Sequence, residues 1–78
     1  FNVYPIPAQK KLKVILKDNV AVERIEFIDY AGKLIAPKHS KRKENTLTLD
    51  VSNLYSGIYI LNLVTEKGTS KARVIIER

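Results

Sequence analysis

The sequence has no cysteine, methionine or tryptophan, and one histidine among its 78 residues. Without cysteine, no disulfide or thiolate metal site can stabilise so small a fold, so apolar packing must do it. Hydrophobic residues make up 45% of the chain, which argues against intrinsic disorder. No apolar run approaches the roughly 20 residues that cross a membrane, so we expect no membrane span. Since the chain begins at Phe1 without methionine, we expect a single domain, residues 1–78, from a longer protein.

Catalytic residues are also scarce. His39 lies in a charged segment with no carboxylate nearby in sequence to orient it, and nucleophilic catalysis needs nucleophile, base and orienting group held together. The Asp and Glu residues are scattered, and no pair has the spacing of an acid–base couple or a calcium loop. We therefore expect no enzyme activity, no cofactor and no metal.

Alternating apolar and polar residues predict strands in most of the chain. Asp18-Asn19 predicts a turn, and the two prolines within Val3–Ala8 suit an extended lead-in or edge segment. About seven short strands, with turn signals roughly every 8–12 residues, indicate an all-β, Ig-like antiparallel β-sandwich. The expected strands lie in the extended lead-in and in residues 11–17, 20–30, 34–35, 46–51, 57–65 and 70–77.

Three residues are predicted to shape the corners of the fold. Gly57 is expected to take a positive φ and close a turn before the most apolar strand. Tyr59 then resembles a tyrosine corner, in which the ring packs in the core and the hydroxyl bonds backbone upstream. Gly32 is expected at the left-handed position of a hairpin turn.

The net charge of +6 indicates an anionic partner. Aromatic stacking platforms are few and no basic amphipathic helix is present, so we do not expect nucleic-acid binding. Residues 38–45 are expected to form a mobile basic surface loop. Candidate contacts to an anionic surface such as lipopolysaccharide, anionic lipid or an acidic protein are Lys11, Lys13, Lys17, Lys41, Arg42 and Lys43, although lysines along a strand are also typical of a solvated face.

Four blocks in sequence order resemble the C-terminal sorting domain of the type IX secretion system. They cover nearly the whole chain, and their order and spacing make the combination more specific than any one of them. The blocks are Tyr4-Pro5-Ile6-Pro7-Ala8 followed by Leu12, residues 25–33 (IEFIDYAGK), residues 49–59 (LDVSNLYSGIY), and a closing strand after Lys67-Gly68.

The resemblance implies an address for protein transport in Gram-negative bacteria. The parent protein would be exported across the inner membrane to the periplasm and then reach the outer-membrane surface or be secreted. A translocon would recognise the folded domain, and a surface sortase commonly removes such a domain and joins the cargo to anionic lipopolysaccharide. The alternative is an Ig-like adhesion or carbohydrate-binding module, which exposed aromatic residues would support; Tyr4, Tyr30 and Tyr55 are the candidates, and we interpret all three as packing residues.

We expect the last two strands, residues 57–65 and 70–78, to form the recognition element. An exposed final strand could be recognised by edge pairing, in which main-chain hydrogen bonds give affinity and alternate side chains give selectivity. Lys71, Arg73 and Arg78 are the expected outward contacts. Exposed edge strands could also pair two copies of the isolated domain into a dimer.

Overall fold

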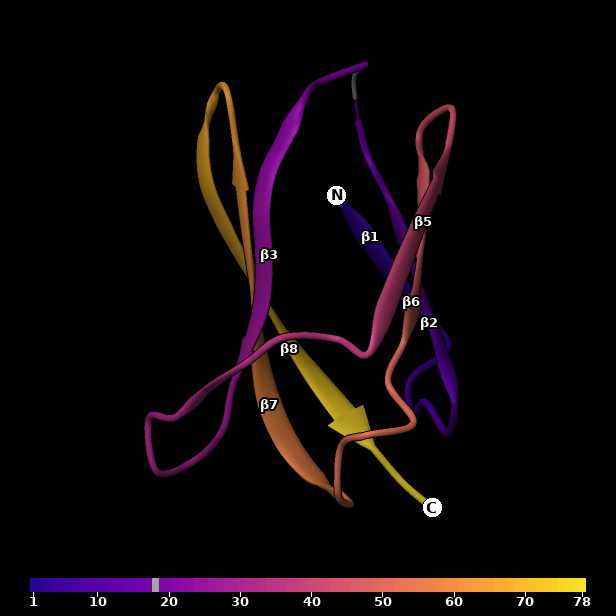
Figure 1. Cartoon of the computed structure of the whole chain (residues 1–78), viewed down its shortest axis with the longest axis vertical. Helices are drawn as coiled ribbons and strands as arrows, with labels where there is room; N and C mark the ends of the chain where they lie inside the picture. Colours follow the sequence, from indigo (N-terminus) through magenta and orange to yellow (C-terminus); the bar gives the residue numbers. More distant parts are fainter. Residues whose placement is uncertain (18) are drawn as a thin grey trace.

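The computed structural model describes residues 1–17 and 19–78, so part of the turn expected at Asp18-Asn19 lies outside the described residues. Two antiparallel four-stranded sheets pack face to face, and no helix occurs in the described ranges (Figure 1). The predicted all-β sandwich is confirmed, with eight strands where about seven were expected. They are β1 (Asn2–Tyr4), β2 (Lys11–Ile15), β3 (Val22–Ile28), β4 (Leu34–Ile35), β5 (His39–Lys43), β6 (Thr46–Asp50), β7 (Gly57–Thr65) and β8 (Gly68–Ile76).

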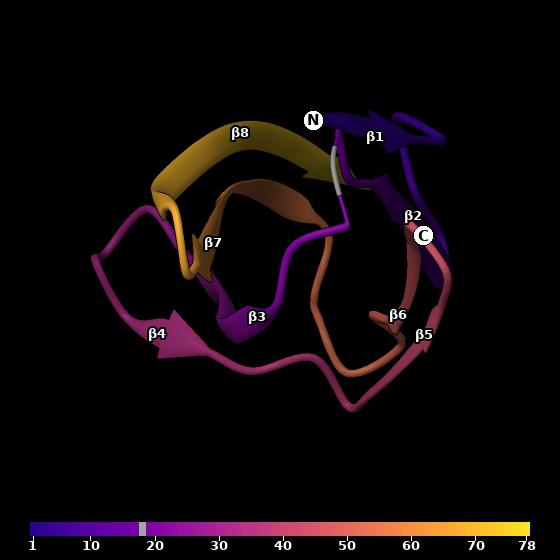
Figure 2. The ribbon, with the colours of Figure 1, turned by 90° about the horizontal axis from the view of Figure 1, so that it is seen from above.

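The strand order separates the chain into two layers. The first sheet has the order β1-β2-β6-β5 and the second sheet the order β4-β3-β7-β8. Seen from above, the two sheets lie on opposite sides of one interior (Figure 2). The described part of the chain contains no helix that is long and apolar enough to cross a membrane.

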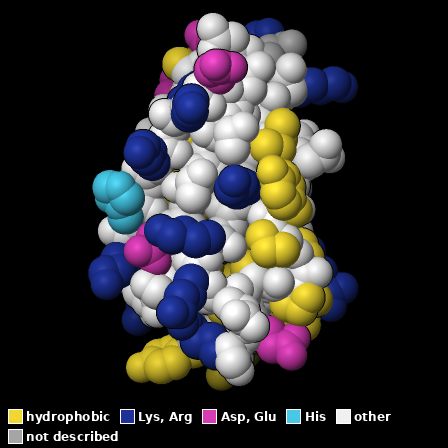
Figure 3. Space-filling view, turned by 90° about the vertical axis from the view of Figure 1, so that its right-hand side faces the viewer, with side chains coloured by type: hydrophobic (Ala, Val, Ile, Leu, Met, Phe, Trp, Pro, Cys, Tyr) yellow, Lys and Arg dark blue, Asp and Glu magenta, His cyan; other side chains and the backbone are white. Residues whose placement is uncertain are grey.

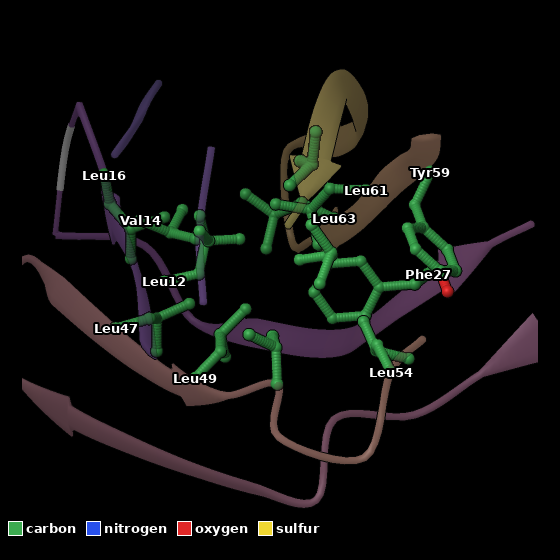
Figure 4. Packing of buried hydrophobic residues seen from close by; sticks show 14 of the residues in the cluster. Leu12, Val14, Leu16, Phe27, Leu47, Leu49, Leu54, Tyr59, Leu61 and Leu63 are labelled. Carbon is green, nitrogen blue, oxygen red and sulfur yellow. The ribbon is translucent and has the colours of Figure 1, made fainter. Parts of the chain in front are cut away.

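The core lies between the sheets and follows the predicted alternation. In the first sheet Leu12 lies opposite Leu49, and Val14 opposite Leu47. These side chains point toward Phe27 and the inward residues of β7 in the second sheet (Figure 4). Burial of such side chains contributes about 1.5–3 kcal/mol each, which is the main stabilising term in a domain without cysteine. The fully buried large side chains are Phe27, Leu12, Leu49, Leu61, Leu63, Ile76, Val14, Val51 and Val74.

The basic segment is a strand, so the prediction of a mobile loop at residues 38–45 is wrong. His39–Lys43 forms β5 and pairs with β6 over five residues. Glu44, at φ 54°, lies in the turn between the two strands. β5 is the last strand of its sheet, and all of its residues are exposed. It has no row of buried apolar side chains, so its main-chain pairing with β6 holds it in the sheet.

The proline-containing segment connects β1 and β2 of the first sheet and also reaches the edge of the second sheet. As expected, β1 is an edge strand, paired with β2. Beyond the prolines, the fully buried Ala8 forms a parallel bridge with Ile76 of β8. The Ala8 N–H donates to the Ile75 carbonyl at 2.9 Å, and the Glu77 N–H donates to the Ala8 carbonyl at 2.8 Å. The N-terminal segment therefore covers the C-terminal end of the β8 edge.

Candidate functional site

Tyr59 fixes the start of β7 with the geometry of a tyrosine corner. Its hydroxyl donates to the Tyr55 carbonyl at 2.7 Å, four residues upstream. The side chain is only 6% exposed, and its ring meets Phe27 edge-on, with centroids 6.2 Å apart and planes at 79°. Burial raises the pKa of Tyr59, and the negative charge of Asp29 raises it further. The ring thus joins the loop before β7 to the core.

The prediction of a positive φ at Gly57 is wrong. Among the described residues, positive φ values occur at Gly32, Gly68 and Glu44. Gly57 is already part of β7 and pairs with Ile76, so its backbone belongs to the antiparallel ladder. The chain turns earlier, where the Leu54 N–H donates to the Val51 carbonyl. Gly32, at φ 84°, takes the left-handed conformation predicted for it.

Arg78 does not project outward as expected, because its guanidinium bonds back to the β6–β7 loop. Its Nε donates to the Leu54 carbonyl and its Nη2 to the Val51 carbonyl, both at 2.7 Å. Its backbone N–H donates to Ser56 Oγ at 3.1 Å. The structure gives this arginine the role of tying the end of the chain to the loop that precedes β7.

The same loop is ordered from its other side by Asp50. The carboxylate accepts hydrogen bonds from Ser52 Oγ at 2.6 Å and from the Ser52 N–H at 2.9 Å. These bonds hold the pKa of Asp50 below its usual value, and the positive charges of Lys11 and Lys38 lower it further. Together with Arg78, Asp50 holds the loop that leads into β7.

β8 presents one free edge to solvent. It is the last strand of the second sheet, and in the described part of the chain only Ala8 bridges its outer edge. The Ile75 carbonyl and the Glu77 N–H bond to Ala8, so both groups point away from β7. In an antiparallel ladder the direction of the main-chain groups alternates from residue to residue. The N–H and C=O groups of the odd-numbered β8 residues therefore all point away from β7. Thr69, Lys71 and Arg73 therefore present main-chain donors and acceptors at the edge.

The side chains of Lys71 and Arg73 are exposed, as predicted. They lie on the outer face of the second sheet, since Ala72, Val74 and Ile76 point inward. The free main-chain groups and two cationic side chains thus occur in one short segment, which is bounded by Ala8 at one end and by the turn before Gly68 at the other.

The structure brings together four of the six lysines and arginines predicted to contact an anionic surface. Lys11 and Lys13 on β2 and Lys41 and Lys43 on β5 share the outer face of the first sheet, which we call the lysine face. Figure 3 views the molecule from this side and shows Lys and Arg side chains gathered over it.

The other two predicted residues lie elsewhere. Lys17 follows the end of β2 and is exposed. Arg42 alternates with Lys41 and Lys43, so it leaves β5 on the opposite side, where its guanidinium donates to the Val20 carbonyl and its Nε to the Glu44 carbonyl. Arg42 therefore closes an end of the sandwich, and the lysine face does not include it.

The interpretation of three tyrosines as packing residues is wrong. Tyr30 is 98% exposed, Tyr55 87% and Tyr4 48%. Tyr30 and Tyr55 line a groove of about 620 Å³ together with the exposed Leu34 and Ile58. Tyr30 lies in a turn, Tyr55 in the β6–β7 loop and Tyr4 at the end of an edge strand, so alternation along the chain carries no information about their exposure.

A comparison with protein families now identifies the chain. The family described as "Secretion system C-terminal sorting domain" matches residues 2–77. The chain belongs to this family. The predicted resemblance is thereby confirmed, and the domain is a C-terminal sorting signal of type IX secretion, whose role is export to the cell surface or secretion. Family membership does not favour the alternative of an adhesion or carbohydrate-binding module.

Solved structures support the fold of the sorting domain. The chain is similar to CopC from Methylosinus trichosporium OB3b, with a TM-score of 0.60 and 22% sequence identity over 94% of this chain and 85% of that chain. At this identity the similarity concerns the β-sandwich fold alone. Among curated proteins, no sequence matches.

Proposed function

We propose that the type IX translocon recognises the folded domain at the free edge of β8 and carries the parent protein from the periplasm to the outer-membrane surface. The observation that supports this proposal is the set of outward main-chain groups at Thr69, Lys71 and Arg73. A partner strand that added there would gain main-chain hydrogen bonds without breaking any bond of the sandwich.

Folding is required for this edge to exist. β8 pairs with β7 over nine residues, and Tyr59 and Arg78 fix the β6–β7 loop that leads into β7. An unfolded chain contains the same residues, but ordering them on binding costs conformational entropy and so lowers the affinity. Recognition of the folded domain is therefore favoured over recognition of a linear tail.

Lys71 and Arg73 would supply selectivity. They are exposed on the outer face next to the free main-chain groups, so a partner strand with acidic residues at alternate positions would meet both. After delivery, a surface sortase would process the domain and join the cargo to lipopolysaccharide. In the purified state, a second copy of the domain could occupy the same edge.

A fusion experiment tests this proposal. Residues 1–78 are attached to a passenger exported in a host that has the secretion system, and surface passenger is measured by protease accessibility on intact cells. Lys71→Glu with Arg73→Glu should lower the surface fraction by roughly tenfold, because both contacts become repulsive. The matched control, Lys41→Glu with Lys43→Glu on β5, should be delivered normally. Normal delivery of the β8 variant would refute a role for these side chains.

Proline substitution tests the main chain itself. The Lys71 N–H points outward and has no partner in β7, so Lys71→Pro removes a donor offered to the translocon while the β7 ladder keeps its bonds. Ala72→Pro removes a ladder bond and serves as the destabilised control. Loss of delivery with Lys71→Pro, in a protein that still melts cooperatively, supports edge pairing.

We also infer that the domain has no catalytic activity of its own. His39 is exposed on β5, and Asp50, its cross-strand neighbour on β6, already accepts two hydrogen bonds from Ser52. This arrangement gives the histidine neither a buried setting nor a free carboxylate to orient it.

A further inference from the structure

Protection of an edge strand does not explain all of the lysine face. Lysines on an edge strand such as β5 discourage pairing with other chains. Lys11 and Lys13, however, lie on β2, which has β1 on one side and β6 on the other. At Lys13 both edges of β2 are already paired, with Tyr4 of β1 on one side and Thr48 of β6 on the other, so this lysine needs another explanation.

The register of the first sheet places the cations around two hydroxyl groups. One row across the strands contains Tyr4, Lys13, Thr48 and Lys41, and in the next row Thr46 lies opposite Lys43. Since adjacent strands are about 4.8 Å apart, the backbones of Lys13 and Lys41 are about 10 Å apart with Thr48 between them. A groove of about 500 Å³ lies over this region and is lined by Lys13, Lys41, Lys43, Thr46, Thr48 and Glu44, among others.

Positive charge exceeds negative charge in this groove, because its lining contains three lysines and one acidic residue, Glu44. Within the described part of the chain, no ion pair involves Lys13, Lys41 or Lys43. Asp50 lies on the same face, but its carboxylate is bonded to Ser52 and is 4.0 Å from Lys11 Nζ. Three ammonium groups beside two hydroxyl donors form a set that suits the oxygens of a phosphate group.

We propose that the lysine face binds the phosphate groups of a phosphorylated polysaccharide. Lys13, Lys41 and Lys43 contact phosphate oxygens, and Thr46 and Thr48 donate hydrogen bonds from the floor of the groove. Tyr4, which is 48% exposed and directly opposite Lys13 on β1, offers one aromatic surface on which a sugar ring can stack.

The composition of the face favours a polysaccharide over two other polyanions. Single-stranded nucleic acid binds to successive aromatic rings, whereas on this face Tyr4 of β1 and His39 of β5 lie on opposite edge strands and in different rows. A lipid surface favours apolar side chains that enter the bilayer beside the cations, whereas the groove has threonine hydroxyls there. The inference uses the domain's role in delivery to the cell surface only to say where the polymer is met; binding itself does not depend on translocon recognition.

Direct titration tests the proposal. Yeast phosphomannan is the probe, and mannan without phosphate is the neutral polymer of the same sugar. Lys41→Glu with Lys43→Glu should weaken phosphomannan binding by about tenfold or more, because charge-assisted hydrogen bonds become repulsive contacts. Tyr4→Ala should weaken it by about fivefold through loss of stacking. The control Lys33→Glu with Lys71→Glu makes the same change in net charge away from the lysine face, in the β3–β4 connection and on β8. Its binding should stay within about threefold of wild type, since screening limits distant charges.

Several results would overturn the proposal. These are equal binding of mannan and phosphomannan, an equal loss of affinity in the control, or tighter binding of poly(U) or phosphatidylglycerol vesicles than of phosphomannan at the same salt concentration. If the glutamate variant unfolds, Lys13→Gln with Lys41→Gln must still weaken binding. Failure here leaves passenger delivery intact, and failure of the β8 variants in delivery leaves phosphomannan binding intact, so the two proposals are tested separately.

Discussion

Removing one hydroxyl group tests how the corner before β7 is stabilised. Tyr59→Phe keeps the ring and its edge-on contact with Phe27 but loses the 2.7 Å hydrogen bond to the Tyr55 carbonyl. The net value of such a bond is about 0.5–1.5 kcal/mol, and an acceptor that is left buried and unpaired costs more. Tyr55 is exposed, so water can replace the lost donor. We therefore expect a destabilisation of about 1 kcal/mol.

Urea denaturation followed by circular dichroism measures this difference. With an m-value of about 1 kcal/mol/M for a domain of this size, the midpoint should fall by about 1 M, and the melting temperature by about 4–8 °C. Tyr30→Phe is the matched control, since Tyr30 is 98% exposed, and should leave both unchanged. Equal midpoints for Tyr59→Phe and Tyr30→Phe would refute the role of the hydroxyl group.

The pH dependence provides a second readout for the same variant. Because burial raises the pKa of Tyr59 in the folded state, its protonated form stabilises the fold fully below the unfolded pKa of about 10. This contribution is lost as the pH rises through the folded pKa. Wild type should therefore lose stability above about pH 10 more steeply than Tyr59→Phe. Parallel curves above that pH would contradict the assignment.

Four further substitutions have definite expected outcomes, each measured by urea or thermal denaturation. Gly57→Ala should change stability by less than about 1 kcal/mol, since the added Cβ meets Tyr59 Cε1 at 3.7 Å, an ordinary contact; a loss of several kcal/mol would show that Gly57 is needed for its backbone. Gly32→Ala should cost about 1 kcal/mol or more because φ is 84°, and an unchanged midpoint would argue against that conformation. Leu49→Ala should cost about 2–5 kcal/mol as a fully buried leucine, and a cost below that range would place Leu49 outside the core. Asp50→Asn should make stability fall less steeply at acid pH. The lowered pKa of Asp50 means that its carboxylate stabilises the fold above about pH 4, and this contribution disappears as the pH falls through the pKa of Asp50 in the folded state. The same acid dependence in wild type and variant would contradict the bonds to Ser52.

The core of the fold was predictable because burial on one face leaves a periodic pattern in the sequence. Leu47 and Leu49 on β6 alternate with threonines, and both are buried. Tyr59 was predictable for a related reason: a turn, a tyrosine and an inward aliphatic residue follow each other in a fixed order. In these segments the local pattern and the tertiary environment agree, so sequence reasoning succeeds.

β5 could not be predicted because it is exposed on both faces and has no apolar row. Its pairing depends on β6 and on the turn at Glu44, which are features of the partner strand and the backbone. Arg78 was wrongly placed for a similar reason. Its acceptors at Val51 and Leu54 are far away in sequence, and no pattern links an arginine to two backbone carbonyls.

The lysine face shows what sequence reasoning could give and what required the structure. Sequence alone could select the cations, but it could not tell which of them share one surface. The β2–β6–β5 register brings Lys13 and Lys41 to the same row, while alternation along β5 sends Arg42 to the other side. The edge of β8 is similar, because its free main-chain groups follow from strand order and from the bridge to Ala8.

Hydrogen–deuterium exchange at single-residue resolution tests the central claim most directly. In the free domain, the N–H groups of Thr69, Lys71 and Arg73 should exchange rapidly, and those of Ala72 and Val74, which bond to β7, slowly. When purified translocon is added, exchange at the three edge positions should slow markedly. Edge amides that exchange as fast in the complex as in the free domain would contradict recognition through the β8 edge.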